Sequence, residues 1–599
     1  MHKKTKPSLL DEITKIHRAA QQTDDGTRCM ISPAPELKKK IDDEIKKLKV
    51  TASRGILSGK IGFRDPQPVG FNDGLIYPGT MFPVGTTASV ARSAGLNRAP
   101  LRGTVRVIVV LVDFSDKVMT KTKAHFEELF FSLGSLSTGS VREYFREVTH
   151  GMVDIQGQVV GTYRMPLTMA QYAHGESGTG SAVPNARTMA KDAAVKSNPA
   201  VNYALYDNDG DGFVDAYVVI HAGTGGEVTG SGNDIWSHKW TLPGGAYTAD
   251  GTTKIFSYLT VPEDCKLGVC AHELGHLLFG FPDLYDTDNS SEGIGNWCLM
   301  ASGSWNNNGL TPAHPSAWCK CQQGWVTTVN QANNQSNVPI EDVKSGFKVH
   351  KLFKNGSSSN EYFLVENRQK TLFDKFLPNS GLLVWHIDDA IASNSNEAHY
   401  KVALMQADGK KDLETNHNRG DAGDCFPGTA NNKKFDNTTI PNSKSYAGSN
   451  TCVGVINISA PAAVMHADLN VKCGIVKSKD IKETLKDLTK DKEISKELKQ
   501  EKIEIKEIEK QADKHLVNDK GIAHDKTLVE KPGDKFTEKI SEGGLGRPGG
   551  LLGGGGHLSV EQRLAQLEAQ LGFVQPFIDQ SKRPDLSQGA LLGEDDNDE

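Results

Sequence analysis

The stretch AHELGHLLFGFPDLYD, residues 271–286, contains His272, Glu273 and His276 in the pattern H-E-x-x-H. Residues four apart lie on one face of a helix, so both imidazoles can bind one metal ion while Glu273 lies beside its water. This arrangement is typical of a zinc-dependent hydrolase. A solvated helix with two incidental histidines is the alternative interpretation, because the pattern also occurs by chance.

The residues on both sides of the pattern favour a buried helix that ends where a further ligand is needed. Residues 267–271 are apolar, and Gly280 and Pro282 follow the second histidine. Glycine and proline at these positions predict the end of the helix. A catalytic zinc takes three protein ligands and leaves a fourth position for water, so one ligand is still missing at this point.

Further motifs surround this segment. They are PD at 282–283, YD at 285–286, GNWCLM at 295–300, SGSW at 302–305, HPSAW at 314–318 and GW at 324–325. With them, the chain resembles the immune inhibitor A family of secreted bacterial metallopeptidases. The likeness covers roughly residues 29–473, is strongest in the catalytic stretch and does not include the C-terminal quarter.

The resemblance implies a metzincin-like zinc site. Its ligands correspond to the two helix histidines and one residue of the following turn, namely His272, His276 and Asp283. The family places glycine three residues after the second histidine, whereas Gly280 comes fourth here. Asp286 and Glu292 therefore remain alternative ligands.

The resemblance also implies the reaction, which is that of a zinc metalloendopeptidase acting on protein or peptide substrates. Zinc lowers the pKa of its bound water to about 7, and Glu273 takes the water's proton as general base and passes it to the leaving amine. Met300 is expected to pack beneath the metal. Tyr285 is left outside the catalytic set, because a tyrosine at a helix end is usually structural.

A second metal site is predicted upstream, in DNDGDGFVD at residues 207–215. Carboxylates stand at positions 1, 3, 5 and 9 of a calcium loop, with glycine at position 6 where the backbone turns sharply. Position 12 is Val218 instead of glutamate, so a structural Ca²⁺ is expected rather than a sensor. The predicted calcium ligands are Asp207, Asp209, Asp211 and Asp215. An ordinary Asp- and Gly-rich surface turn is the alternative.

A third acidic segment is NRGDAGD at residues 418–424. Its Arg-Gly-Asp triplet is too short to predict an integrin ligand. We interpret the segment as a turn, with a cation-bound turn as the alternative.

Mixed strand and helix patterns predict an α/β catalytic domain over residues 100–329. A buried strand is expected at 105–113, and a helix is expected after the capping pair Ser140 and Glu143. Another helix is expected at 185–196.

The pattern changes after residue 329. Short apolar strands such as 361–366 and 381–387 are separated by Asn, Gly and Ser. Residues 330–473 are therefore predicted to form a β-sandwich domain.

Residues 1–99 have the pattern of a pro-segment. An amphipathic helix is predicted, with one stripe formed by Leu37, Ile41, Ile45 and Leu48. Cys29 precedes this helix, and a thiolate can occupy the open position of zinc and keep a protease latent as a zymogen. An isolated cysteine is more often an inert thiol, so the latency switch at Cys29 is a hypothesis beside that interpretation.

Two further segments follow residue 473. Residues 474–542 are rich in Lys and Glu and are predicted to be a charged helical linker. Residues 543–599 contain a glycine-rich hinge and a short amphipathic helix with Val560, Leu564 and Leu567 at heptad spacing. Self-association or partner docking through this helix is a hypothesis.

Composition limits the classes of partner. The formal net charge of −6 over 599 residues gives no nucleic-acid footprint. The longest aliphatic run, residues 107–112, is too short to span a bilayer.

The nine cysteines cannot all pair, and Cys425 with Cys452 is the expected disulfide. The basic start lacks the apolar core of a standard secretory signal, whereas the resemblance favours an extracellular protein.

Two function classes follow from these observations. A zinc endopeptidase is the prediction, and a non-catalytic secreted binding or adhesion protein on a protease-like scaffold is the alternative. The presence of Glu273 favours the enzyme, since a scaffold without activity has little need of an acid/base carboxylate. Other zinc hydrolases such as amidases are a further alternative, because the pattern does not specify the acyl substrate.

Overall fold

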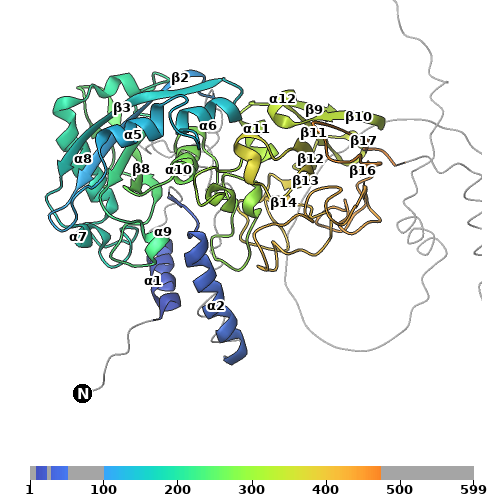
Figure 1. Cartoon of the computed structure of the whole chain (residues 1–599), viewed down its shortest axis with the longest axis horizontal. Coiled ribbons are helices and arrows are strands. Elements are labelled where there is room, and N and C mark those ends of the chain that lie inside the picture. Colours follow the sequence, from blue (N-terminus) through green and yellow to red (C-terminus); the bar gives the residue numbers. More distant parts are fainter. Residues whose placement is uncertain (1–7, 23–27, 52–99, 474–599) are drawn as a thin grey trace, which may run out of the picture. The chain divides into compact units, whose positions relative to one another are not determined.

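A computed structural model describes residues 8–22, 28–51 and 100–473, all of which lie in the compact unit Met1–Cys473. A six-stranded sheet forms the first part, in the order β1-β5-β8-β4-β2-β3 (Figure 1). Strands β8, β4, β2 and β3 are parallel, and β5 and β1 are antiparallel additions. The strands are β1 (Cys29–Met30), β2 (Gly103–Asp113), β3 (Val153–Arg164), β4 (Tyr217–His221), β5 (His238–Thr241) and β8 (Ser257–Pro262).

Helices cover both faces of this sheet, because its central strands alternate their apolar side chains between two cores. Val107 and Val109 of β2 pack into one core, and Ile108 and Val110 pack into the other. The first core contains residues of α5 (Lys123–Phe131), α6 (Val141–Val148) and α10 (Leu267–Phe279). The second contains residues of α7 (Met169–Ala173) and α8 (Ala186–Ser197).

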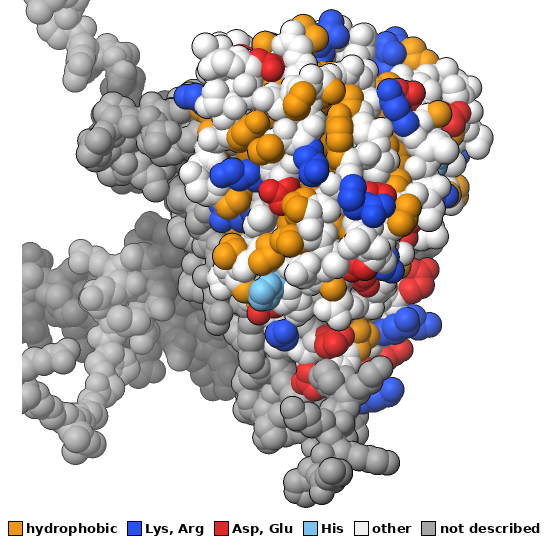
Figure 2. All heavy atoms as spheres, turned by 90° about the vertical axis from the view of Figure 1, so that its left-hand side faces the viewer, with side chains coloured by type: hydrophobic (Ala, Val, Ile, Leu, Met, Phe, Trp, Pro, Cys, Tyr) orange, Lys and Arg blue, Asp and Glu red, His pale blue; other side chains and the backbone are white. Residues whose placement is uncertain are grey.

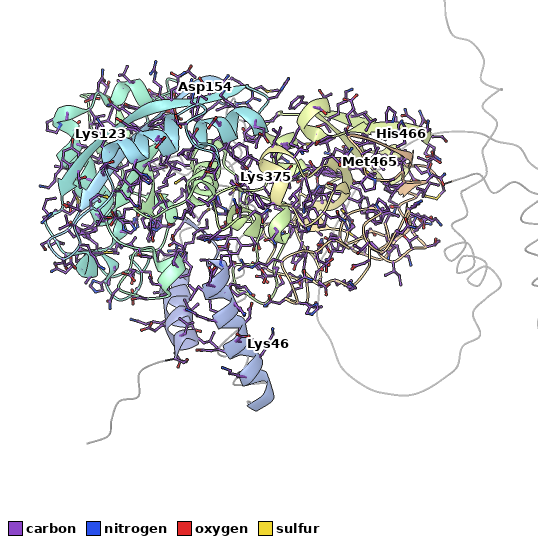
Figure 3. All side chains as sticks on the ribbon, viewed as in Figure 1. Lys46, Lys123, Asp154, Lys375, Met465 and His466 are labelled. Atoms are coloured by element: carbon purple, nitrogen blue, oxygen red, sulfur yellow. A yellow bond between two sulfur atoms is a disulfide. The ribbon has the colours of Figure 1, made fainter. Side chains whose placement is uncertain are left out.

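Polar contacts fix the ends and flanks of these helices. Ser140 and Glu143 form the expected capping box at the start of α6. On the same helix, Arg142 donates from Nε and Nη2 to Asp154 of β3 at 2.7 and 2.8 Å (Figure 3 labels Asp154). Asn185 caps α8.

Two antiparallel-rich sheets form the second part. The four-stranded sheet contains β10 (Gln335–Glu341), β17 (Val464–Asn470), β16 (Gly454–Ile456) and β15 (Lys434–Phe435). The five-stranded sheet contains β14 (Val402–Leu404), β13 (Gly381–Asp388), β12 (Glu361–Arg368), β11 (Lys348–Leu352) and β9 (Thr327–Gln331). One hydrophobic core holds side chains of both sheets, for example Ile340 and Met465 with Phe363 and Val384.

The remaining elements of the described residues are two N-terminal helices and several short helices and strands. They are α1 (Leu9–Gln22), α2 (Pro35–Thr51), η2 (Asn198–Ala200), η3 (Tyr203–Tyr206), α9 (Gly226–Thr229), β6 (Tyr247–Thr248), β7 (Lys254–Ile255), η4 (Gly295–Trp297), η5 (Ser302–Trp305), α11 (Ala317–Gln322), α12 (Val343–Gly346), η6 (Lys354–Gly356) and η7 (Leu372–Phe376). Within the described ranges, no helix combines the length and the apolar character needed to cross a bilayer.

The expected strands and helices are present with small changes at their ends. The strand at 105–113 is the main part of β2, the helix at 185–196 is α8, and the strands at 361–366 and 381–387 lie within β12 and β13. Strand β9 runs through the predicted domain boundary at residue 329, because it pairs in parallel with β11 of the second part. The predicted linker, hinge and C-terminal helix at 474–599 lie outside the described residues.

The expected Cys425–Cys452 disulfide is wrong, because Cys452 is bonded to Cys473. Antiparallel pairing of β16 with β17 brings Gly454 opposite Asn470, so the flanking cysteines have Cα atoms only 4.8 Å apart. The Cys425 thiol is buried and donates to the Ser380 carbonyl oxygen at 3.2 Å.

The molecular face at the left-hand side of Figure 1 is shown in Figure 2. Basic and acidic side chains are interspersed on this face, and hydrophobic side chains lie between them. Charges of one sign therefore do not gather over it.

Candidate metal centre

The helix that carries the H-E-x-x-H pattern is buried along its whole length. Every residue of α10 is buried. The helix ends at Gly280, whose left-handed backbone (φ 65°) lets its N–H donate to the carbonyls of Gly275 and His276. A residue with a side chain would be strained in that conformation, so glycine fixes the point where the chain leaves the helix and turns back.

The two histidines point their Nε2 atoms at each other. The Nδ1 atoms of His272 and His276 lie 2.9 and 2.5 Å from the carbonyl oxygens of Leu299 and Phe281. A carbonyl can only accept, so each Nδ1 carries a proton, and the neutral tautomer of each ring then has its lone pair on Nε2. The two Nε2 atoms are 3.0 Å apart.

Asp283 completes this group from the turn after the helix. Its Oδ1 lies 3.1 Å from His272 Nε2 and 3.2 Å from His276 Nε2. The turn is held in place because Leu284 N–H donates to the Met300 carbonyl at 2.7 Å. Three buried atoms with lone pairs therefore converge on one point, and a cation is the species that satisfies all three. The donor set of two imidazoles and one carboxylate fits a catalytic zinc.

The alternative ligands Asp286 and Glu292 are engaged elsewhere. Asp286 Oδ2 accepts from Ser291 N and Ser291 Oγ at 3.0 and 2.7 Å. Glu292 pairs with Lys38 at 3.2 Å and with Arg419 at 3.4 Å. Of the three candidates, Asp283 is thus the carboxylate that lies against the histidines.

Glu273 stands beside this group with a carboxylate that nothing satisfies. Both of its oxygens are buried and have no hydrogen-bond partner among the described residues. Burial raises the pKa of Glu273 well above its ordinary value, and the charge of Asp283 raises it further. An unsatisfied buried carboxylate is costly, so it is expected where a bound water or substrate will use it.

Met300 packs under the helix between the two histidines. A side chain at Gly275 would place its Cβ 2.8 Å from Met300 Sδ, so glycine is what lets the methionine approach. Both residues are buried. This position agrees with the one expected from the resemblance.

Three residues outside the predicted ligand and catalytic set lie near the centre, and one of them is Cys29, the thiol that the sequence offered as a latency ligand. Cys29 lies in β1, and its Sγ forms a group with His276 and Asp283 in which the ligand atoms are all within 4.8 Å of one another. Tyr285 donates from its hydroxyl to the Met30 carbonyl at 2.6 Å. Lys239 is buried on β5, and its charge acts to lower the pKa of Glu273. Sequence spacing gives no signal for Lys239, because only the pairing of β1 with β5 places it here.

Three of the four carboxylates predicted to bind calcium lie together in the loop at residues 207–215. Oxygens of Asp207, Asp209 and Asp215 lie within 4.8 Å of one another. Asp211 is not in that group, and its Oδ1 accepts from Phe213 N at 2.9 Å. Many of the carboxylate contacts are to the loop's own N–H groups, as in an Asx turn.

The segment at 418–424 is a turn, as expected. Gly423 N–H donates to Asp421 at 2.6 Å, and Asp424 accepts from Trp297 Nε1 at 2.9 Å. Asp421 also lies within 4.8 Å of Asp408 and Asp412, which sequence spacing did not connect with it. The group is an acidic cluster of the second part of the unit.

Comparison with known proteins identifies the stretch around this centre. Residues 98–330 match the family described as immune inhibitor A peptidase M6, catalytic domain. The pre-pro-metalloprotease PrtV of Vibrio cholerae serotype O1 is 31% identical over 272 residues, which cover 36% of this chain and 29% of that protein. Immune inhibitor A of Bacillus thuringiensis subsp. alesti is 30% identical over 259 residues, which cover 35% and 38%. The chain therefore spans well under half the length of these relatives.

Proposed function

We propose that this chain, which carries a peptidase M6 catalytic domain of the immune inhibitor A type at residues 98–330, is a zinc-dependent endopeptidase that cleaves protein substrates. The family match confirms the resemblance inferred from the motifs around His272. One observation carries the proposal, namely the convergence of His272, His276 and Asp283 beside the unpartnered carboxylate of Glu273.

The proposed chemistry divides between the metal and the side chains. His272, His276 and Asp283 hold the zinc, which when bound lowers the pKa of its water and polarises the scissile carbonyl. Glu273 accepts the proton of the attacking water and delivers it to the leaving amine. The carbonyls that accept from the two Nδ1 atoms keep the imidazoles neutral and oriented.

We make four further proposals, for the acidic loop, for the residues after the catalytic domain, for the location of the protein and for its N-terminal residues. The loop at 207–215 is proposed to hold a structural Ca²⁺, and residues 330–473 a β-sandwich domain whose two sheets share a core. We place the protein outside the cell, and the Cys452–Cys473 disulfide supports an oxidising compartment. Residues 1–99 are proposed to be a pro-segment.

Casein cleavage by the purified full-length chain tests the function, with zinc quantified in the same preparation. We expect near one zinc per chain and slow cleavage that a chelator abolishes and added zinc restores. The matched variant Glu273→Gln should bind zinc equally and show no cleavage. Cleavage that survives both the chelator and this substitution would contradict the mechanism. Bound zinc without cleavage from any form, including the Cys29 variant described below, would favour the binding-protein alternative.

A further inference from the structure

Residues 28–34, which lead into α2, pass beside the candidate metal centre and are here called the strap. They run along the edge of the six-stranded sheet. In the strap, Cys29 and Met30 pair antiparallel with Lys239 and His238 of β5. The strap is therefore an extra edge strand beside the helix that carries the ligands.

Hydrogen bonds from the catalytic domain hold the strap in an extended form. They join main-chain atoms of the strap to main-chain and side-chain groups of the catalytic domain. They are Ile31 N to Ser237 O (3.2 Å), Ala34 N to Glu227 O (2.9 Å), Trp236 Nε1 to Ile31 O (2.8 Å), Trp305 Nε1 to Ser32 O (3.0 Å) and Tyr285 Oη to Met30 O (2.6 Å). Contacts to the main chain do not depend on side-chain identity, so they suit an extended peptide in general.

The side chain of Cys29 is the part of the strap that faces the metal ligands. Its Sγ lies within 4.8 Å of ligand atoms of His276 and Asp283, and the residue is only 3% exposed. The carboxylate of Glu273, with no partner, lies in the same buried centre. Thiolate is a good fourth ligand for zinc, and a catalytic site leaves one position for it.

The two helices that flank the strap are anchored on the domain surface. Ile13 of α1 and Leu37 of α2 both approach Gly230, where a side chain would meet them. Lys38 Nζ makes a buried ion pair with Glu292 at 3.2 Å and donates to Asn416 Oδ1 at 3.0 Å. The predicted stripe of α2 is buried at Leu37, Ile41 and Ile45, while the side chain of Leu48 lies outside the described residues.

The helices lie side by side and leave the domain together (Figure 1). The outer part of α2, where the exposed Lys46 lies, extends away from the rest of the unit (Figure 3). Contacts of Ile13 in α1 and of Leu37 and Lys38 in the first turn of α2 therefore hold these helices on the domain. Release of these contacts would remove the strap without unfolding the sheet behind it.

We infer that the strap is a built-in pseudo-substrate whose Cys29 thiolate is the fourth ligand of the zinc, so that the described form is latent. This inference rests on the proposed function. The strap occupies the edge of β5, where an extended peptide would otherwise pair by strand addition. When Cys29 binds, its thiol proton passes to the solvent. When the strap leaves, Sγ takes up a proton and a water molecule takes the fourth position.

Cobalt-substituted full-length protein tests the ligand directly, apart from activity. Wild-type protein should show the thiolate-to-cobalt charge-transfer band, and zinc X-ray absorption should show one sulfur at about 2.3 Å among lighter ligands. Cys29→Ser should lose both signals while keeping bound metal. Cys321→Ser, a change of a half-buried thiol in α11, is the matched control and should keep both.

Casein cleavage tests latency with the same variants. If the strap closes about nine molecules in ten, Cys29→Ser should cleave about ten-fold faster than wild type. Lys38→Met should also cleave faster, because it loosens the strap without removing the thiol. Metal bound without sulfur in the wild type, or a Cys29→Ser rate equal to that of Cys321→Ser, would overturn the inference.

A separate variant tests the proposed catalytic function independently of the thiolate ligand. Adding Glu273→Gln to Cys29→Ser should abolish cleavage, and retained cleavage would refute the catalytic mechanism while the cobalt band still reports the thiolate ligand. Absence of bound metal from wild type and Cys321→Ser alike would refute the metal centre itself, and the inference with it.

Discussion

The candidate metal centre and the loop at 207–215 each bring three candidate ligand residues together, but the two regions differ in what else those residues contact. At the centre, His276 and Asp283 are fully buried, and each imidazole Nδ1 is already used by a carbonyl. In the loop, Asp207 accepts from the N–H groups of Gly210, Asp211 and Gly212. The loop can therefore keep its shape without an ion, whereas the centre has converging lone pairs that only a cation satisfies.

This difference predicts which substitutions lower the reaction rate and which lower the free energy of unfolding. A buried group with no hydrogen-bond partner is available for reaction, so its removal lowers the catalytic rate. A solvated carboxylate that already has partners contributes little beyond local structure. Substitutions in the two regions should therefore differ in the size and the kind of their effects.

Glu273→Gln should have the largest effect. Loss of a general base lowers the rate by roughly 10²–10⁴-fold, and zinc content should stay unchanged because Glu273 is not a ligand. Steady-state cleavage of a peptide by the Cys29→Ser form, with zinc measured in parallel, checks this. Asp209→Asn is the matched change in the loop, and an equal loss of rate there would remove the contrast.

Asp283→Ala should release the metal. Substitution of residues that only hydrogen-bond to the ligands already lowers metal affinity by about 10–100-fold, and this substitution removes a ligand itself. Competition with a zinc chelator measures the affinity. Asp286→Ala and Glu292→Ala serve as controls and should retain the metal, so a loss confined to either of them would identify a different third ligand.

Gly268→Ala should destabilise the centre by overpacking. A Cβ at this position of α10 would lie 1.9 Å from the Ser304 carbonyl oxygen, which belongs to backbone and cannot move aside. Overpacking of this kind costs about 1–3 kcal/mol in the free energy of unfolding, and here the upper end is expected. Urea denaturation measures it. A variant as stable as wild type would show that η5 can shift freely against the helix.

Gly210→Ala should lower the free energy of unfolding by a smaller amount, through backbone strain instead of overpacking. Its Cβ would meet no atom within 4 Å, but the backbone has φ +77°. The expected cost is the left-handed strain alone, about 1–2 kcal/mol, with zinc content unchanged. Parallel urea curves for both glycine variants compare the two regions directly.

Asp209→Asn should have the smallest effect on the protein without calcium, less than about 0.5 kcal/mol. The same change should weaken the rise in melting temperature that added calcium produces in the wild type. Calorimetry with and without calcium checks this. If calcium does not stabilise even the wild type, the loop is an ordinary turn.

Much of the centre follows from the sequence because its parts are local. Two histidines four residues apart share a face of any helix, and Gly280 predicts where that helix ends. The capping box at Ser140 and the strand around Val107 are local for the same reason, and both are present. Strand β9 crosses the predicted boundary at residue 329, because a parallel partner is invisible to local patterns.

The sequence alone was enough to place the two histidines of α10, the carboxylate of Glu273 beside them and the acidic loop upstream, because each depends on residues within one or two turns of chain. Only the tertiary structure decided that Asp283 lies against the histidines while Asp286 and Glu292 bond elsewhere. It also decided that Cys29 lies at the metal centre and that Cys452 pairs with Cys473. These contacts join residues far apart in the chain, and only the packing of the sheets and helices brings them within bonding distance.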